Sequence, residues 1–253
     1  MKYHLKQRLK KGETVFGSFL SFHGADAAEI MALAGFDFLV IDTEHGPWSP
    51  ETALELVRAG DVRRVPSVVR VPDSAPESIL KVLDIGAVGV QVPQVNTVQQ
   101  AEGIVRSAHY HPIGRRGLAM PRAADYGALG VSEYFQRSAE QTLVVAQCES
   151  TEGLEQLEEI VQVPHLDVLF LGPFDLSHSL GVPGEVEHPK VKEAEKKVVQ
   201  LCKKYGKTAG IFVVDAASAR RRVEEGFRYI CLSMDSLLLA QVAKAELYAA
   251  RDE

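Results

Sequence analysis

Acidic side chains follow two neighbouring strand-like segments, where they could hold a metal ion. Glu149 ends the apolar segment 142–149, and Asp175 follows the next such segment, 166–173. Carboxylate oxygens with no histidine or cysteine beside them suit hard divalent cations such as Mg²⁺ or Mn²⁺. The alternative is that Glu149 caps a helix beginning at Ser150 and that Asp175 is solvated in a loop. Because the two carboxylates follow consecutive segments, the metal site is the favoured interpretation.

A histidine and an arginine occupy comparable positions after two earlier segments. His45 lies three residues after Asp42 in a turn, and a histidine there is the natural general base, with a purely structural role as the alternative. Arg70 ends an apolar segment, so its buried cation needs an anionic partner or ligand. It could pair with Asp42 or Glu149, or it could stabilise a carboxylate or an enolate of a substrate. These two roles are compatible.

Two further features point to a substrate beside these groups. Side chains alternate along a strand, so Gln147 shares a face with Glu149. The segment 172–175, Gly-Pro-Phe-Asp, leads out of a strand, and its backbone N–H groups at Phe174 and Asp175 could bind a carboxylate.

An alternation of strand-like and helix-like segments has to position these side chains. Strands are predicted at 14–20, 36–45, 65–71, 87–93, 142–149, 166–173, 208–214 and 227–233. Helices are predicted at 24–35, 49–60, 75–86, 97–108, 150–162, 190–206, 215–226 and 235–250, and 109–130 is predicted to be irregular. Eight such pairs predict an α/β fold, a (β/α)8 TIM barrel that forms a single domain over residues 1–253. An open doubly wound sheet is the alternative, but no Gly-rich first turn follows a strand.

Lysines are missing from the predicted strand ends. They occur in the N-terminal segment, near helix ends and on polar helix faces. An enzyme that forms a Schiff base in a barrel needs a lysine at a strand end. The loops after the last two strands also lack a Gly-rich phosphate-binding sequence. The sequence therefore argues against imine chemistry and against a sugar phosphate substrate.

Composition excludes several classes of protein. The net charge of -6 gives no basic footprint for nucleic acid. No apolar run reaches the roughly 18–20 residues of a membrane span, and the N-terminal segment lacks the apolar core of a signal peptide. Three scattered cysteines are too few for a disulfide or zinc framework. We therefore expect a cytoplasmic protein that acts on small molecules, with neither nucleic acid nor membrane as a partner.

Several motifs, in order along almost the whole chain, resemble those of the HpcH/HpaI aldolase family. They are F-G-S-F-L (16–20), A-G-F-D-F-L-V-I-D-T-E-H-G-P (34–47), V-R-V-P (69–72), L-D-I-G-A-V-G-V-Q-V-P (83–93), Q-C-E-S (147–150) and L-G-P-F-D-L-S (171–177). The resemblance implies a class II pyruvate aldolase on a barrel fold. Such an enzyme depends on a divalent metal, Mg²⁺ or Mn²⁺ with Co²⁺ as a further candidate, and on no organic cofactor. It releases pyruvate and an aldehyde from a 4-hydroxy-2-oxo acid.

The same resemblance implies roles for individual residues. Glu149 and Asp175 match metal ligands, His45 matches the base, and Arg70 matches the cation that stabilises the enolate. The remaining assignments are substrate contact for Gln147, Gly172, Phe174, Asp175 and Phe212, a supporting position for Asp42, and pairing with the catalytic histidine for Asp84. The segment 118–130 and Phe212 depart from the family pattern, and both departures concern the aldehyde half of the substrate.

Asp84 also carries an expectation about assembly. It ends the predicted helix 75–86 just before a strand, whereas His45 follows a strand, so the two lie at opposite ends of a barrel. A strand of five or six residues spans roughly 17–20 Å, too far for a side chain to bridge. If Asp84 orients His45, it comes from a neighbouring chain; otherwise it caps or solvates its helix end. The resemblance implies a homo-oligomer, a hexamer, and the predicted final helix offers an apolar packing surface: Leu237, Leu238, Leu239, Val242 and Leu247.

The favoured function is a carbon–carbon lyase acting on a 2-oxo acid, and three alternatives stay open. A lyase of acyl-CoA esters would need a basic channel, for which Arg115 and Arg116 are the clustered candidates outside helices. An oxaloacetate decarboxylase would pass through the same enolate. A catalytically silent barrel subunit is the third alternative, but the presence of all four predicted catalytic and metal-binding residues argues against it.

Overall fold

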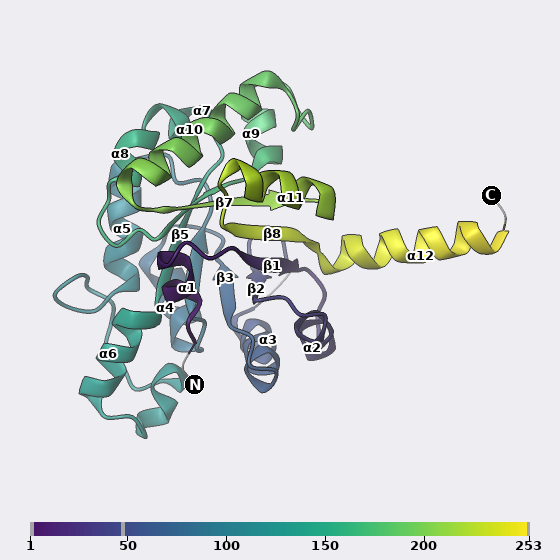
Figure 1. Cartoon of the computed structure of the whole chain (residues 1–253). Helices are drawn as coiled ribbons and strands as arrows, with labels where there is room; N and C mark the ends of the chain where they lie inside the picture. The colour runs from purple at the N-terminus through teal and green to yellow at the C-terminus, as the bar shows by residue number, and fades with distance from the viewer. Residues whose placement is uncertain (1–2, 47–48, 252–253) are drawn as a thin grey trace.

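Eight parallel strands form a closed barrel in the computed structural model, which describes residues 3–46 and 49–251. Each strand pairs with the next, and β8 pairs with β1 (Figure 1). The strands are β1 (Val15–Leu20), β2 (Phe38–Asp42), β3 (Ser67–Arg70), β4 (Gly89–Val92), β5 (Leu143–Cys148), β6 (Val168–Leu171), β7 (Thr208–Val213) and β8 (Tyr229–Met234). The predicted (β/α)8 barrel is confirmed. Pro47, which ends the motif beginning at Ala34, lies outside the described residues.

Helices cover the outside of the barrel. They are α2 (Ala25–Leu33), α3 (Pro50–Val62), α4 (Pro76–Asp84), α5 (Val98–Ala108), α6 (Val131–Gln141), α7 (Thr151–Glu155), α8 (Leu157–Val161), α9 (Pro173–Ser179), α10 (Pro189–Tyr205) and α11 (Ala216–Glu225). α1 (Leu5–Lys10) packs its Leu5 and Leu9 against the interior of the barrel and closes its N-terminal end. No helix of the described residues is long and apolar enough to cross a membrane.

The side chains that face the barrel interior lead directly to the polar residues of the sequence motifs. In β5, Val145 belongs to the interior cluster, and Gln147 and Glu149 follow at intervals of two residues. In β2, Val40 belongs to the same cluster and Asp42 follows it. Because side chains alternate between the faces of a strand, these polar residues form the last interior layer, at the C-terminal ends of the strands.

Five local features differ from the sequence-based expectation. α1 was not predicted, and the predicted helix 150–162 is broken into α7 and α8. The predicted irregular stretch contains a 3-10 turn, η1 (Arg122–Gly127), and is followed by α6, which was not predicted either. α6 is a mostly polar helix that buries Tyr134 and Ser138, so it contributes little apolar surface to the core. Asp175, predicted to lie in a loop, is in the first turn of the short helix α9, which begins at Pro173.

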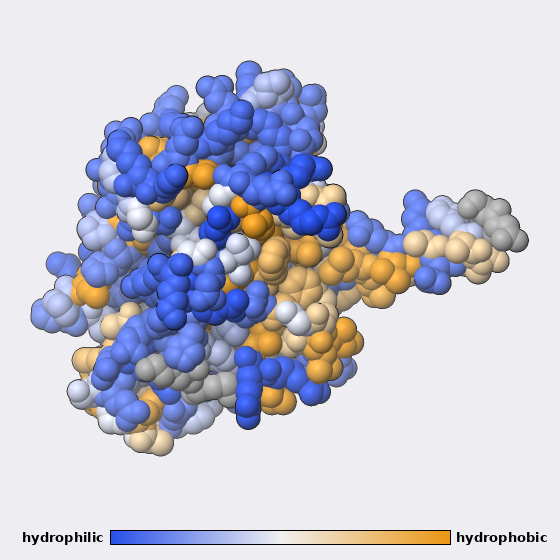
Figure 2. All heavy atoms as spheres, viewed as in Figure 1, coloured by the Kyte–Doolittle hydropathy of each residue, from blue (hydrophilic) through white to orange (hydrophobic). Residues whose placement is uncertain are grey.

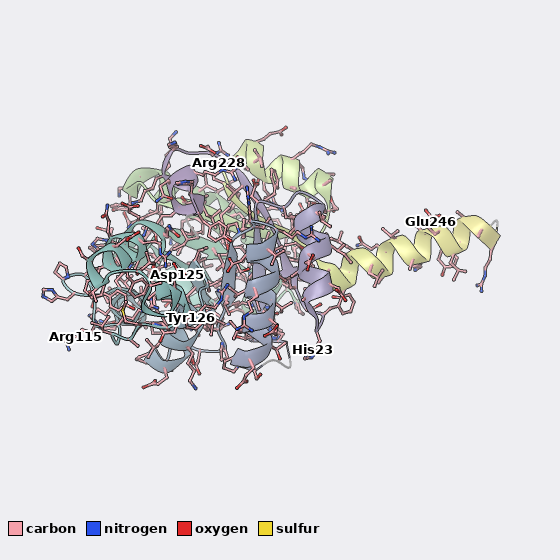
Figure 3. All side chains as sticks on the ribbon, turned by 90° about the horizontal axis from the view of Figure 1, so that it is seen from below. His23, Arg115, Asp125, Tyr126, Arg228 and Glu246 are labelled. Atoms are coloured by element: carbon pink, nitrogen blue, oxygen red, sulfur yellow. The ribbon has the colours of Figure 1, made fainter. Side chains whose placement is uncertain are left out.

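The last helix, α12 (Asp235–Arg251), extends away from the barrel (Figure 1). A view from below, in which Glu246 is labelled, shows it equally clear of the barrel (Figure 3). Asp235 is its buried residue, whereas Leu239 and Val242 are 60% and 61% exposed. Orange, apolar atoms run from the barrel surface onto this helix (Figure 2). The predicted final helix is confirmed, and its role in packing between chains stays a prediction.

Candidate active site

A cavity of about 140 Å³ opens at the C-terminal ends of the strands. The residues that line it are Phe19, His45, Arg70, Gln147, Glu149, Phe170, Gly172, Pro173, Phe174, Asp175, Phe212 and Met234. The structure therefore brings together every predicted site residue except Asp42, which lies directly behind Arg70, and Asp84. Larger cavities open at the N-terminal ends of the strands, the end of a barrel that serves stability rather than catalysis.

Glu149 is a buried carboxylate, 2% exposed, held by two donors. Its Oε1 accepts the backbone N–H of Gln94 at 3.0 Å, and its Oε2 accepts Nε2 of Gln147 at 2.8 Å. Burial raises the pKa of Glu149 to about 7, and the negative charge of Asp175 adds to the rise against the opposing effect of the Gln94 N–H. A bound cation would allow Glu149 to ionise at neutral pH.

Glycine is required beside this carboxylate. A Cβ atom built on Gly172 would overlap Oε2 of Glu149.

The amide of Gln147, which donates to Glu149, belongs to a chain of hydrogen bonds. Its Oε1 accepts a hydrogen bond from Nε2 of Gln91, and Oε1 of Gln91 accepts one from the hydroxyl of Tyr229 at 3.3 Å. This polar chain through the barrel interior fixes the orientation of the Gln147 amide and hence the hydrogen bond it donates to Glu149.

The two predicted metal ligands, Glu149 and Asp175, have the chemistry of a hard-oxygen site. Glu149 is raised in pKa by its neighbours Asp175 and Glu44, so the negative charges of three carboxylates act on one another. Within the described residues no group of three or more His, Cys, Asp or Glu side chains is arranged to hold a metal ion. Two carboxylates with water and substrate oxygens completing the shell are typical of Mg²⁺, so the donor set of Glu149 and Asp175 fits such an ion.

Arg70 is held in a fixed orientation by acidic partners. Its Nε and Nη2 donate to the two carboxylate oxygens of Asp42 at 2.8 and 2.6 Å, and its Nη1 lies 3.1 Å from Oε2 of Glu44. The guanidinium carbon lies 4.7 Å from the centre of the Phe19 ring. The Arg70 side chain is 10% exposed and lines the cavity. The predicted pairing with Asp42 is confirmed, and it leaves the cation facing the site.

His45 is open to the cavity and to solvent, with 68% of its side chain exposed. Its Nε2 lies 4.0 Å from Oε2 of Glu44. The backbone N–H groups of Glu44 and His45 both donate to Oδ1 of Asp42, at 3.1 and 3.4 Å. Asp42 therefore positions both Arg70 and the turn that carries the histidine.

Aromatic side chains form an apolar wall of the cavity. The ring of Phe212 lies 5.8 Å from that of Phe19 and 6.1 Å from that of Phe174, measured between centroids. Phe170 and Met234 complete this wall. Of these, the sequence analysis assigned roles only to Phe174 and Phe212.

Three polar contacts of the site were also missed, for different reasons. Glu44 and Gln91 stand at predicted strand ends and could have been assigned by the rule used for Arg70. The contact of Gln94 could not have been assigned in this way, because Gln94 donates to Glu149 through its backbone N–H and not through its side chain. Gln94 has a left-handed φ of 52°.

Asp84 lies apart from the cavity, at the end of α4, which precedes β4 at the N-terminal end of the barrel. Its Oδ1 accepts a hydrogen bond from Nη2 of the buried Arg116 at 2.7 Å. Within one chain, therefore, Asp84 and His45 stand at opposite ends of the barrel, as the sequence predicts. Pairing with the histidine of another chain stays a prediction.

Comparison with known proteins identifies the family of this chain. The HpcH/HpaI aldolase/citrate lyase family model matches residues 16–241. The chain belongs to this family. A hydroxypyruvate/pyruvate aldolase of Paraburkholderia phytofirmans is 37% identical over 98% of this chain and 97% of its own length. A 4-hydroxy-2-oxo-heptane-1,7-dioate aldolase of Escherichia coli is 34% identical over 97% of this chain and 94% of its own length. The crystal structure of a family member from Burkholderia cenocepacia matches with a TM-score of 0.92 at 38% identity, over 98% of both chains.

Proposed function

We propose that this protein is a metal-dependent pyruvate aldolase that cleaves a 4-hydroxy-2-oxo acid into pyruvate and an aldehyde. The observation that carries the proposal is a single cavity in which two carboxylates, an oriented arginine and an open histidine meet at the C-terminal ends of the strands. The names of the relatives, which are aldolases of pyruvate or of a 4-hydroxy-2-oxo acid, support the same reaction.

Glu149 and Asp175 would hold the divalent cation, Mg²⁺ or Mn²⁺ with Co²⁺ as a further candidate. When bound, it supplies Lewis-acid polarisation of the 2-oxo and carboxylate oxygens of the substrate. The substrate carboxylate would also accept hydrogen bonds from the backbone N–H groups of Phe174 and Asp175. Both groups lie in the first turn of α9, where the first backbone hydrogen bond of the helix runs from the N–H of Leu176 to the carbonyl of Gly172 at 3.0 Å. Gln147 would contact the substrate from the floor of the cavity.

His45 would take the proton of the C4 hydroxyl group as general base. The electron pair of the broken O–H bond then forms the C=O double bond of the departing aldehyde, and the electrons of the C3–C4 bond pass into a pyruvate enolate. The fixed guanidinium of Arg70 would stabilise the negative charge that develops on the enolate oxygen. Protonation of the enolate at C3 gives the methyl group of pyruvate, and the reverse sequence adds pyruvate to an aldehyde.

The mechanism is tested by two treatments with opposite expected results. Chelation should abolish cleavage, because the carboxylate pair would lose its cation. Borohydride with pyruvate should leave the enzyme active, because no lysine is among the described residues that line the cavity. Full activity after exhaustive chelation would overturn the proposal, as would inactivation that depends on both pyruvate and borohydride.

The apolar wall favours an aldehyde with an uncharged, apolar substituent. Phe19, Phe174 and Phe212 face the catalytic groups, and the cation of the cavity, Arg70, is already paired with Asp42 and Glu44. A charged aldehyde tail would lose hydration against these rings without a free counter-charge from the described lining of this chain. Apolar aldehydes should therefore add to pyruvate faster than aldehydes of similar size that carry a carboxylate.

The alternative of an acyl-CoA lyase is less well supported. Its candidate phosphate-binding residues, Arg115 and Arg116, line other cavities and not the catalytic one, and Arg116 is paired with Asp84. Oxaloacetate decarboxylation remains chemically close because it forms the same enolate. A panel of pyruvate with aldehydes, set beside oxaloacetate alone, separates these activities.

We also infer a homo-oligomer, and the family resemblance favours a hexamer. Leu239, Val242 and Leu247 of α12 are exposed in the single chain, and α2 exposes Ile30 and Leu33 as a second apolar surface. A helix of this length is stabilised mainly by packing of such a face. Leu239→Asp should therefore lower the mass measured by sedimentation. In an assembled structure, an Asp84 carboxylate far from every His45 would remove it from its predicted catalytic role.

A further inference from the structure

A second cavity, of about 590 Å³, opens at the opposite end of the barrel from the catalytic one. It lies at the starts of β5 and β7 and just before β6, with α1 on one side. Three lysines and two histidines line it: Lys6, Lys10, Lys207, His109 and His165. Of the described residues in this lining, Asp167 alone is acidic.

The carboxylate of Asp167 already accepts two hydrogen bonds. Oδ2 of Asp167 accepts Nζ of Lys6 at 2.9 Å and the backbone N–H of Val144 at 3.0 Å. Lys6, whose side chain is buried, also donates to the carbonyl of Thr142 at 2.7 Å. Asp167 therefore balances Lys6 and joins two strand starts, and among the described lysines it forms an ion pair with Lys6 alone.

The other two lysines bring charge that is not balanced locally. Nζ of Lys207 donates to the carbonyl groups of Val163 and Leu166, at 2.9 and 2.8 Å, which are neutral acceptors. Over residues 3–46 and 49–251, neither Lys10 nor Lys207 forms an ion pair. Burial lowers the pKa of Lys207; the charge of Asp167 opposes this fall, and the charges of Lys6 and Lys10 add smaller contributions to it.

A buried histidine responds to the same excess of positive charge. Burial, with a further contribution from Lys6, His165 and Arg116, lowers the pKa of His109 to about 3. His109 is therefore neutral at physiological pH, and its Nε2 is buried without a hydrogen-bond partner in the described structure. An anion in the cavity would relieve the mutual repulsion of the lysines.

We propose that this cavity binds a small phosphate-bearing metabolite through Lys6, Lys10 and Lys207. Lysines bind phosphate as point charges, whereas planar, bidentate recognition of a carboxylate uses arginine, and arginine is not among the described residues of this lining. Because the catalytic cavity lies at the other ends of the strands, the anion and the substrate bind without competing.

Titration calorimetry with inorganic phosphate tests the site on the metal-loaded enzyme. Saturating pyruvate is included so that the catalytic cavity is filled. Lys10→Gln should weaken phosphate binding about tenfold, the contribution of one hydrogen bond to a charged group. Lys196→Gln, which removes the same charge from an exposed position on α10, should leave the affinity unchanged. An equal effect of both variants, or the absence of binding, would overturn the proposal.

A second measurement locates the bound anion. Phosphate should slow the acetylation of Lys10 and Lys207, followed by mass spectrometry, and should leave Lys196 unprotected. Tighter binding of citrate than of phosphate would refute the assignment of the ligand class, and loss of phosphate binding on addition of pyruvate would place the anion in the catalytic cavity instead. Neither result depends on aldolase activity, so the site can fail while the proposed function stands.

Discussion

The burial of Glu149 predicts a pH-dependent stability that a metal ion should reverse. The carboxyl group has a pKa of about 7 in the folded chain, against an ordinary value of 4.5. Between these two values the folded state binds more protons than the unfolded state, so the free energy of unfolding falls as pH rises. The loss begins near the lower value and is complete above about pH 7.

The size of the effect follows from the shift. A difference of about 2.5 pH units, at about 1.4 kcal/mol per unit, gives roughly 3 kcal/mol, which is a large part of the stability of an ordinary domain. Glu149→Gln removes the ionisation but also disturbs one of the two hydrogen bonds to the carboxylate, a penalty of about 1 kcal/mol that does not depend on pH. The variant should therefore overtake the wild type as pH rises.

Denaturant unfolding of chelator-treated protein, at one fixed protein concentration, measures this. The difference in unfolding free energy between Glu149→Gln and wild type should grow by about 3 kcal/mol from pH 4.5 to above pH 7. Mg²⁺ should then restore the wild type, by about 2.7 kcal/mol at a hundred times its dissociation constant, and should have no effect on the variant. Asp175→Asn is the matched control, since it removes one charge that raises the pKa of Glu149. In the Asp175→Asn background, the pH-dependent effect of Glu149→Gln should be smaller than in the wild-type background.

Two results would refute this reasoning. A difference between variant and wild type that stays constant with pH would mean that Glu149 is ionised in the folded, metal-free chain. A stabilisation of Glu149→Gln by Mg²⁺ equal to that of wild type would mean that the ion binds elsewhere.

Three substitutions test the roles of other site residues. Arg70→Ala should reduce both aldol cleavage and exchange of the pyruvate methyl protons by about 10²–10³, because both pass through the enolate; full exchange by NMR in heavy water would remove Arg70 from that role. Phe212→Leu should change the preference among aldehydes while exchange stays near normal, and a change in exchange alone would contradict its position in the aldehyde wall. Gly172→Ala should weaken metal binding with the fold retained by circular dichroism, because its Cβ would displace the Glu149 carboxylate; unchanged metal affinity would show that the carboxylate can move freely.

The fold could be predicted from the sequence because its signal is repeated. Eight apolar segments, each followed by a helical pattern, allow few architectures, and the error at any one boundary does not change the count. α6 was missed because it buries little apolar surface, and α1 because six residues are too few to show a period. These helices are fixed by tertiary packing, which the local sequence records weakly.

The site was predictable to the extent that it is built from strand-end side chains. His45, Arg70, Glu149 and Asp175 have types and positions that point to chemistry, and the structure places them in one cavity. What the sequence could not supply is the relation between distant residues: Gln94 reaches Glu149 across 55 positions through a backbone N–H. Side-chain type carries no information on such a contact.

Asp42 shows why the polar rim of this barrel has to be considered as a unit. One carboxylate orients the guanidinium of Arg70 with both oxygens, and with one of them it also fixes the turn that carries His45. A substitution such as Asp42→Asn would keep one acceptor but lose the carboxylate that binds Arg70 through both oxygens, leaving Glu44 as its remaining acidic partner. Removing one partner of a buried ion pair costs about 3–5 kcal/mol, and the charge of Glu44 should keep the loss at the lower end of that range. His45, the proposed base, and Arg70, the proposed enolate-stabilising cation, are therefore positioned by the same residue, and neither can be moved independently of the other.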